Sequence, residues 1–232
     1  MGAAAAPTGP LPERGCIAAI FDVDRTLLPG TTTERLFLRY LVMRRHYGPR
    51  AALATIRLLA RHARLGPFHA LRQHRPYLRG WEVARMDALG ADAFAATIAP
   101  RLAPLGVARV GEHLAAGHLT ALLSGSLPFL LAPLARRLGV AHVIVAPLEV
   151  VDGAYTGELA GEHAYAATKA RLADRFAREH GADLADAYAY ADHHTDAALL
   201  ALCGHPVCVN PTAKLRRLAA RRGWPVEAWP AG

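Results

Sequence analysis

Cysteines, lysines and long apolar runs are scarce in this chain of 232 residues, and these scarcities exclude several classes of protein. The three cysteines, Cys16, Cys203 and Cys208, are odd in number and show no paired metal-ligand spacing, so neither a disulfide framework nor a zinc module is indicated. No uncharged run approaches the roughly 20 apolar residues that a membrane-spanning helix needs. We therefore expect a soluble protein of the reducing cytoplasm, without a membrane span.

The first 15 residues lack the features of a targeting segment. They contain small residues and prolines, but no basic start followed by an apolar stretch, so a secretory signal is not indicated. Ala6 occupies the position at which a myristoylation signal requires Ser or Thr. Residues 1–15 are therefore predicted to be a flexible tail.

The positive charge of the chain is concentrated in one segment. The formal net charge is +8, yet residues 31–107 hold 13 arginines, no lysine and four acids, a local charge of +9 that leaves −1 for the remainder. Such a segment suits an anionic partner, although arginine is also the default solvated residue on the helices of an arginine-rich protein. Both interpretations stay open at this stage.

Strand and helix signals alternate outside that segment. Short apolar runs predict strands at 17–21, 119–124, 142–151, 187–191 and 206–210, and helical periodicity predicts helices at 107–116, 127–138, 166–180, 196–202 and up to about 222. This alternation is typical of an α/β fold with a Rossmann-like, mostly parallel sheet flanked by helices. Asp152-Gly153 predicts a hairpin turn.

The segment between the first two core strands has a different pattern. Apolar residues recur there at helical spacing, and Gly-Pro pairs divide it into three or four expected helices. We predict a core domain formed by residues 16–30 and 107–232, with a helical cap, residues 31–106, inserted after the first core strand. A ligand would bind outside the carboxyl ends of the strands.

Two carboxylates follow the first predicted strand. Asp22 and Asp24 lie on either side of Val23, so one could attack phosphorus while its neighbour exchanges protons with the leaving oxygen and with water. An Asp-rich turn explains this pair equally well when it is taken alone.

Three further groups follow in chain order. Ser124-Gly125 ends a predicted strand and could hold phosphate oxygens, Lys169 is one of only two lysines, and Asp192 and Asp196 are four residues apart after another strand. Each has an ordinary alternative, namely a helix cap, a surface lysine or a solvated helix acid. Their order along the chain makes the set specific.

The motifs FDVDRTLL, LLSGS, Lys169 and YADHHTD together resemble the haloacid dehalogenase superfamily, in its phosphoserine-phosphatase-like branch. The resemblance runs from about residue 17 to 210. It implies a phosphatase with Asp22 as the nucleophile, Asp24 as the general acid and base, and Lys169 as a catalytic cation. It further implies that Mg²⁺ would be held by Asp22, Asp24 through its backbone carbonyl, and Asp192, that Asp196 would orient the lysine, and that Ser124, Gly125 and Asn210 would contact the substrate. We also expect substrate contacts from Thr26 and from Arg25, whose guanidinium suits an anionic group.

The sequence also departs from this family. The family usually has a small residue where this chain has Arg25, which could change the entrance of the site. It usually has Gly at the position of Ala191 and Ser at that of His193, and these two changes could alter the surroundings of the metal. Phosphoserine enzymes of the family carry a Glu that pairs with the substrate ammonium, at the position that is Thr31 here. Phosphoserine is therefore not expected to be the preferred substrate.

Two alternatives belong to other functional classes. Asp192-His193-His194 matches the DHH phosphoesterases, but the 38 residues that follow lack the Gly-rich, His-containing motif of that family. The basic insert, with Arg57, Arg61 and Arg64 in a helical stripe, could instead bind nucleic acid or an anionic membrane.

We favour catalysis over both alternatives because every catalytic position is filled. The expected enzyme hydrolyses a small phosphorylated metabolite with additional anionic or hydroxyl groups. No nucleic-acid partner is expected, and a homo-oligomer is possible.

Overall fold

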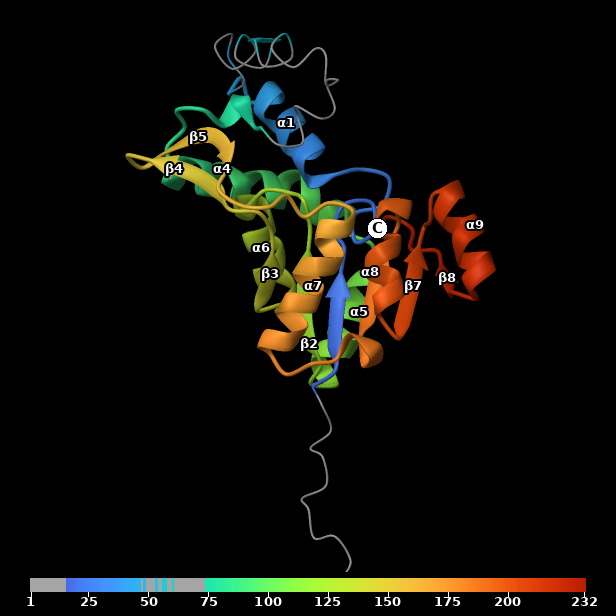
Figure 1. Ribbon diagram of the computed structural model, residues 1–232. Coiled ribbons are helices and arrows are strands. Elements are labelled where there is room, and N and C mark those ends of the chain that lie inside the picture. The colour runs from blue at the N-terminus through green and yellow to red at the C-terminus, as the bar shows by residue number, and fades with distance from the viewer. Residues whose placement is uncertain (1–15, 47, 49–52, 54–55, 58–59, 61–73) are drawn as a thin grey trace, which may run out of the picture.

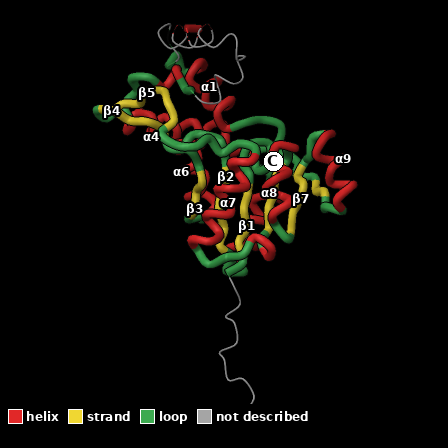
Figure 2. Tube along the Cα trace, in the orientation of Figure 1, coloured by secondary structure: helices red, strands yellow, loops and turns green. Residues whose placement is uncertain are grey.

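The predicted parallel sheet forms the centre of the computed structural model, which describes residues 16–46, 48, 53, 56–57, 60 and 74–232 (Figure 1). Its six strands are parallel and stand in the order β3-β2-β1-β6-β7-β8. The strands are β1 (Ala18–Phe21), β2 (Leu119–Leu123), β3 (His142–Ile144), β6 (Tyr188–Ala191), β7 (His205–Val209) and β8 (Val226–Glu227). Helices cover both faces of the sheet (Figure 2). The predicted α/β class is confirmed.

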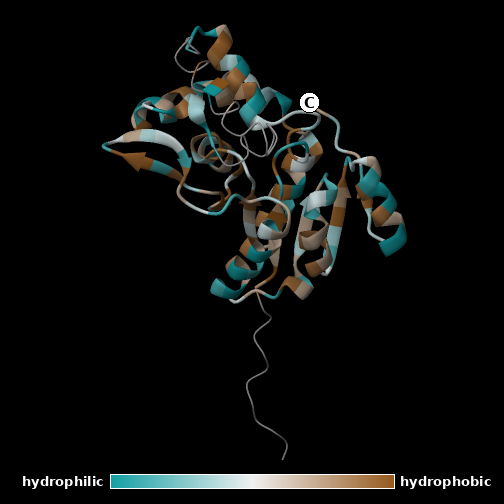
Figure 3. Ribbon diagram, turned by 45° about the horizontal axis from the view of Figure 1, so that its top comes forward, coloured by the Kyte–Doolittle hydropathy of each residue, from teal (hydrophilic) through white to brown (hydrophobic). Residues whose placement is uncertain are grey.

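The central strand, β1, contributes to a hydrophobic core on each face of the sheet. Its four residues are fully buried, and successive side chains point to opposite faces. Ala18 and Ile20 join the core beneath α7 (Ala167–Glu179), α8 (Ala197–Leu202) and α9 (Ala213–Arg222). Ala19 and Phe21 join the core that includes α5 (Pro104–Ala115) and α6 (Pro128–Leu138). Figure 3 shows hydrophobic residues along the strands and hydrophilic residues on the outer sides of the helices.

The segment between β1 and α5 is helical where it is described. It contains α1 (Thr33–Met43), the 3₁₀ turns η2 (Pro76–Leu78) and η4 (Ala99–Arg101), helix α4 (Val83–Ala93) and the π turn η3 (Phe94–Ile98). We call these elements the cap, although its boundary with the core at 106/107 stays a prediction. None of the described helices has the length and apolar character required to cross a membrane.

The prediction of a single strand over 142–151 is wrong. β3 ends at Ile144, and β4 (Leu148–Val151) leaves the sheet to pair with β5 (Ala154–Leu159). Pro147 lies at the break, where it has no N–H to offer to a ladder. The hairpin turn at Asp152-Gly153 is confirmed, with φ of 50° and 76°.

The hairpin is bonded to the cap rather than to the sheet. The backbone N–H groups of Gly80 and Val83 donate to the carbonyls of Tyr155 and Gly153 at 2.8 and 3.1 Å. The hairpin formed by β4 and β5 falls within residues 107–232, the range predicted for the core, but it lies beside α4 and η2 (Figure 1).

A buried histidine packs against one face of the sheet, where its ring contacts those of Phe21 and Tyr190. His113, on α5, is 5% exposed, and its Nε2 shares a hydrogen bond of 2.8 Å with the hydroxyl of Tyr190. Its Nδ1 lies 2.8 Å from Nδ1 of His118. Burial, and then the neighbouring His118 and Arg109, lower the pKa of His113 to about 4.

We predict that His113 makes the fold sensitive to acid. An unfolded histidine titrates near pH 6.5, so between pH 6.5 and about 4 the unfolded chain binds a proton that folded His113 does not. The contribution of neutral His113 to the free energy of unfolding is fully present above pH 6.5. It decreases by on the order of 1–3 kcal/mol as the pH falls towards 4. Urea unfolding at a series of pH values should show a shallower decline for His113→Gln than for the wild type, and equal declines would contradict the assignment.

Candidate active site

All but two of the predicted site residues line one cavity of about 360 Å³, at the carboxyl ends of β1, β2 and β6. Parallel strands bring these ends to the same edge of the sheet. Core residues contribute Asp22, Asp24, Arg25, Ser124, Gly125, His163, Ala164, Tyr165, Lys169, Asp192, His193, Thr195 and Asp196, and the cap side contributes Thr32, Glu34 and Arg75.

Asp22 follows β1 directly and is held at both carboxylate oxygens. Lys169 Nζ donates to Oδ1 at 2.5 Å, and the Thr26 hydroxyl donates to Oδ2 at 2.8 Å. Asp22 is only 4% exposed, but it lines the cavity. The carboxylate is therefore fixed in orientation at the edge of a space that could hold a ligand.

Lys169 connects Asp22 to a second carboxylate. It lies in the first turn of α7, and its Nζ also donates to Asp196 Oδ2 at 3.0 Å. Burial by itself would lower the pKa of Lys169, but the charges and hydrogen bonds of Asp22 and Asp196 outweigh that effect and raise it above its ordinary value. The lysine is therefore a permanent cation inside the site.

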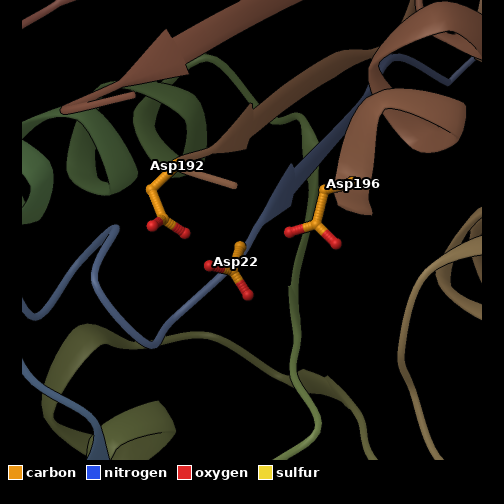
Figure 4. A group of neighbouring side chains, drawn as sticks. All are labelled: Asp22, Asp192 and Asp196. Atoms are coloured by element: carbon orange, nitrogen blue, oxygen red, sulfur yellow. The ribbon is translucent and has the colours of Figure 1, made fainter. Parts of the chain in front are cut away.

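Three carboxylates form a group that could hold a metal ion. One oxygen from each of Asp22, Asp192 and Asp196 lies within 4.8 Å of the others, and all three residues are buried (Figure 4). Burial, and then the charges of Asp22 and Asp196, raise the pKa of Asp192 to about 7. Carboxylate oxygens are ligands for hard cations such as Mg²⁺, so the donor set fits that ion. His193 and His194 belong to no such group within the described chain.

Asp24 is oriented by the first turn of α1. Its Oδ1 accepts hydrogen bonds from the backbone N–H of Thr33 at 2.7 Å and from the Thr33 hydroxyl at 2.9 Å. The Thr33 hydroxyl also bonds to that of Ser126. The pKa of Asp24 is raised to about 6. Burial is the main cause and the charge of Asp22 adds to it, while the hydrogen bonds from Thr33 act in the opposite direction. Asp24 can therefore carry a proton near neutral pH.

Ser124 and Gly125 form another wall of the cavity. They follow β2, and the Ser124 oxygen accepts from the backbone N–H of Ser126 at 3.1 Å. His163 Nε2 lies 3.2 Å from the Gly125 carbonyl oxygen and is placed to donate to it. A Cβ at position 125 would lie 2.9 Å from that ring nitrogen, so a larger residue there would have to displace the His163 ring.

Two residues predicted to contact the substrate, Thr26 and Asn210, do not line the cavity. Thr26 is fully buried and does not line the cavity, because its hydroxyl is used to hold Asp22. Asn210 is also absent from the cavity wall: its side chain accepts from the Trp229 N–H at 3.0 Å and donates to the Trp229 carbonyl at 2.7 Å. Asn210 therefore anchors the C-terminal segment.

The unusual residues of the motifs do lie at the cavity. Arg25 lines it with φ of 67°, a left-handed conformation that a side chain makes unfavourable, which explains why a small residue is usual there. Its backbone N–H bonds to the carbonyls of Leu28 and Thr31. His193 also lines the cavity, and its Nδ1 accepts from the N–H of Thr195 at 3.3 Å.

The cap residues that line the cavity, Thr32, Glu34 and Arg75, were not among the predicted site residues. Glu34 reaches the cavity, and its Oε1 lies 2.8 Å from Arg75 Nε and accepts from the Tyr77 hydroxyl at 2.5 Å. The cap thus supplies an acid to the cavity from position 34 rather than 31, and the prediction that phosphoserine is not the preferred substrate stays a prediction.

The described part of the predicted arginine stripe, Arg57, does not line the active-site cavity. Arg57 is exposed and does not line the cavity, and Arg61 and Arg64 lie outside the described residues. A role for the stripe in attracting substrates stays a prediction.

Several known proteins are similar to this chain in sequence and in fold. The family model of haloacid dehalogenase-like hydrolases matches residues 19–201. Phosphoserine phosphatase SerB1 of Mycobacterium tuberculosis is 33% identical over 90% of this chain and 70% of its own. Histidinol-phosphatase of Neisseria meningitidis is 28% identical over 90% and 96% of the two chains.

A solved structure from Bordetella pertussis, of a protein described as having unknown function, has a TM-score of 0.78 and 30% identity. The alignment covers 91% of this chain and 98% of that one. Neither the DHH phosphoesterases nor a non-catalytic binding module is favoured by these findings. The chain belongs to the haloacid dehalogenase-like hydrolase family.

Proposed function

We propose that this protein is a magnesium-dependent phosphomonoesterase that uses Asp22 as its nucleophile. The observation that carries the proposal is the fixed Asp22 carboxylate, held by Lys169 and Thr26 at the edge of the cavity. Asp24 and Ser124-Gly125 line the same cavity. The names of the relatives, which include phosphoserine phosphatase and histidinol-phosphatase, support a phosphorylated substrate.

The first step transfers the phosphoryl group to the protein. An oxygen of Asp22 attacks phosphorus, a bond forms between them, and the bond from phosphorus to the leaving oxygen breaks. Asp24, whose pKa is raised to about 6, donates its proton to that oxygen and releases the alcohol. Lys169 and the Ser124-Gly125 segment lie where they can bind the phosphoryl oxygens.

The second step returns the protein to its starting state. Asp24, now ionised, takes a proton from water as the water oxygen attacks phosphorus. The bond between phosphorus and Asp22 breaks, inorganic phosphate leaves, and Asp24 holds a proton again.

Mg²⁺ would be held by Asp22, Asp192 and the backbone carbonyl of Asp24, with Asp196 close by. When bound, it would neutralise negative charge on the nucleophile and on the phosphoryl group. Asp196 bonds to Lys169 and so keeps the lysine directed at Asp22.

The cavity wall beyond these residues suggests the class of substrate. Arg25 can donate hydrogen bonds to hydroxyl or anionic groups, whereas Glu34, whose charge is paired with that of Arg75 in the same wall, can accept from a donor. A small hydroxyl-rich phosphate monoester satisfies both. Phosphoserine and histidinol phosphate, which carry an amine that could also bind to Glu34, are the alternative.

We predict that Asp22→Asn abolishes turnover, because an amide is a poor nucleophile and lacks the negative charge that pairs with Lys169. Chelation of divalent metal should also abolish turnover in the wild type. Release of phosphate from a panel of phosphorylated metabolites is the measurement, and exposed Asp186→Asn is the matched control that should keep full activity. Substantial turnover by Asp22→Asn, or by the chelated enzyme, would remove the mechanism.

We predict that Asp24→Asn lowers kcat by roughly 10²- to 10⁴-fold while KM changes little, because the amide can still accept from Thr33 but cannot donate a proton to the leaving oxygen. A substrate with a good leaving group, such as p-nitrophenyl phosphate, needs less protonation and should lose less in its first step. Steady-state and burst kinetics with p-nitrophenyl and alkyl phosphates provide the comparison. An equal burst rate constant in variant and wild type for an alkyl phosphate argues against this role.

We predict that Glu34→Gln separates the two substrate classes. If a bound amine pairs with Glu34, removal of the charge should raise KM for amine-bearing monoesters by about tenfold or more. For hydroxyl-rich monoesters the amide still accepts a hydrogen bond, so KM should change by less than about threefold. The preference for hydroxyl-rich substrates is wrong if phosphoserine or histidinol phosphate has the highest kcat/KM in the wild type and this value falls in the variant.

A further inference from the structure

A second basic cavity lies outside the active site, where the cap joins the core. It has a volume of about 300 Å³ and is lined by Gly30, Thr31, Arg35, Leu36, Arg39 and Arg101. We call it the linker cleft. Gly30-Thr31 belongs to the chain that enters the cap, and Arg101 ends η4, immediately before the chain returns to the core. The two connections are close together, since the N–H of Ala103 donates to the Leu27 carbonyl at 3.0 Å.

The charges that line the linker cleft are all of one sign. Three of its six lining residues are arginines, and none is an acid. Among the described residues, Arg35 and Arg39 form no ion pair, and Arg101 donates only to the backbone carbonyl of Thr97, at 2.8 Å. Glu34, although next in sequence to Arg35, bonds to Arg75 and Tyr77 at the active site.

Arg35 and Arg39 are four residues apart and so lie on the same side of α1, which places both guanidinium groups opposite η4. Elsewhere on the described surface, Arg171 and Arg178 each pair with an acid, at 2.5 and 2.9 Å. Guanidinium groups that converge without a carboxylate repel one another, and an anion with several oxygens relieves that repulsion while accepting bidentate hydrogen bonds.

We propose that the linker cleft binds a small polyanion with two phosphate-like groups and, by doing so, ties α1 to η4. This goes beyond the proposed phosphatase activity, since no residue of the linker cleft lines the active-site cavity. The ligand would act on that site indirectly. The Thr31 carbonyl accepts from the Arg25 N–H at 3.0 Å, and Thr33 holds Asp24, so the linker that forms the cleft also supports the catalytic loop.

The test uses methylenediphosphonate, which a phosphatase cannot hydrolyse at its P–C–P bridge, and the metal-free full-length protein. Without a divalent cation, the five carboxylates of the active site outnumber its three cations, Arg25, Arg75 and Lys169, and leave it less favourable for an anion. Isothermal titration calorimetry should therefore show one site, and added sodium chloride should weaken binding. Arg35→Gln/Arg39→Gln should bind at least about tenfold more weakly.

The matched control is Arg136→Gln/Arg137→Gln, which removes two exposed charges from α6 and should bind as the wild type does. Arg101→Gln tests the opposite wall and should also weaken binding, and circular dichroism verifies that each variant is folded. The proposal is wrong if the wild type does not bind, if both double variants weaken equally, or if Arg35→Gln/Arg39→Gln alters only self-association in sedimentation velocity. Because the readout is binding, absence of phosphatase activity would leave this result intact.

Discussion

The buried contact between Lys169 and Asp22 is the interaction on which the rest of the site depends. Isolated charges are costly to bury, and a buried pair is tolerated only when hydrogen bonds satisfy both partners. Here Thr26 and Asp196 complete that satisfaction. Five carboxylates nevertheless face one lysine and two arginines around the cavity, and the pKa values of Asp24, Asp192 and Asp196 are all raised, chiefly by burial. A divalent cation would offset that excess of negative charge, which is the physical argument for a metal in the proposed mechanism.

The parallel sheet converts distant parts of the sequence into this one site. β1 pairs with β2 on one side and β6 on the other, so the residues that follow these strands meet at one edge. Two connections lead from that edge to the cap, and Thr33 of α1 reaches back to Asp24. The position of the cap and the orientation of the proposed acid are therefore coupled through a single residue.

Much of the core could be predicted from the sequence because its signals are local. A short apolar run followed by Asp22, Ser124 or Asp192 indicates both a strand and the group at its end. Contacts made by the cap carry no such signal. Glu34 and Arg75 are 41 positions apart, and only the folded cap brings them to the same cavity.

The departures from the predictions have a similar cause. Asn210 follows a core strand as Asp22 and Asp192 do, but Trp229 folds back and occupies both of its polar atoms. Residues 142–151 have the apolar character of one strand, yet Pro147 interrupts the ladder and the second half pairs with β5 instead. In both cases the local sequence pattern indicates the strand, but contacts with distant residues determine what the strand or the residue after it binds.

The central claim is that the phosphoryl group passes through Asp22, and a chemical trap tests it most directly. Borohydride reduces an acyl phosphate to an alcohol, so enzyme quenched during turnover and then reduced should contain homoserine at position 22. Peptide mass spectrometry would locate the change. The account predicts reduction at Asp22 that requires both substrate and Mg²⁺, and reduction at another carboxylate, or none during active turnover, would contradict it.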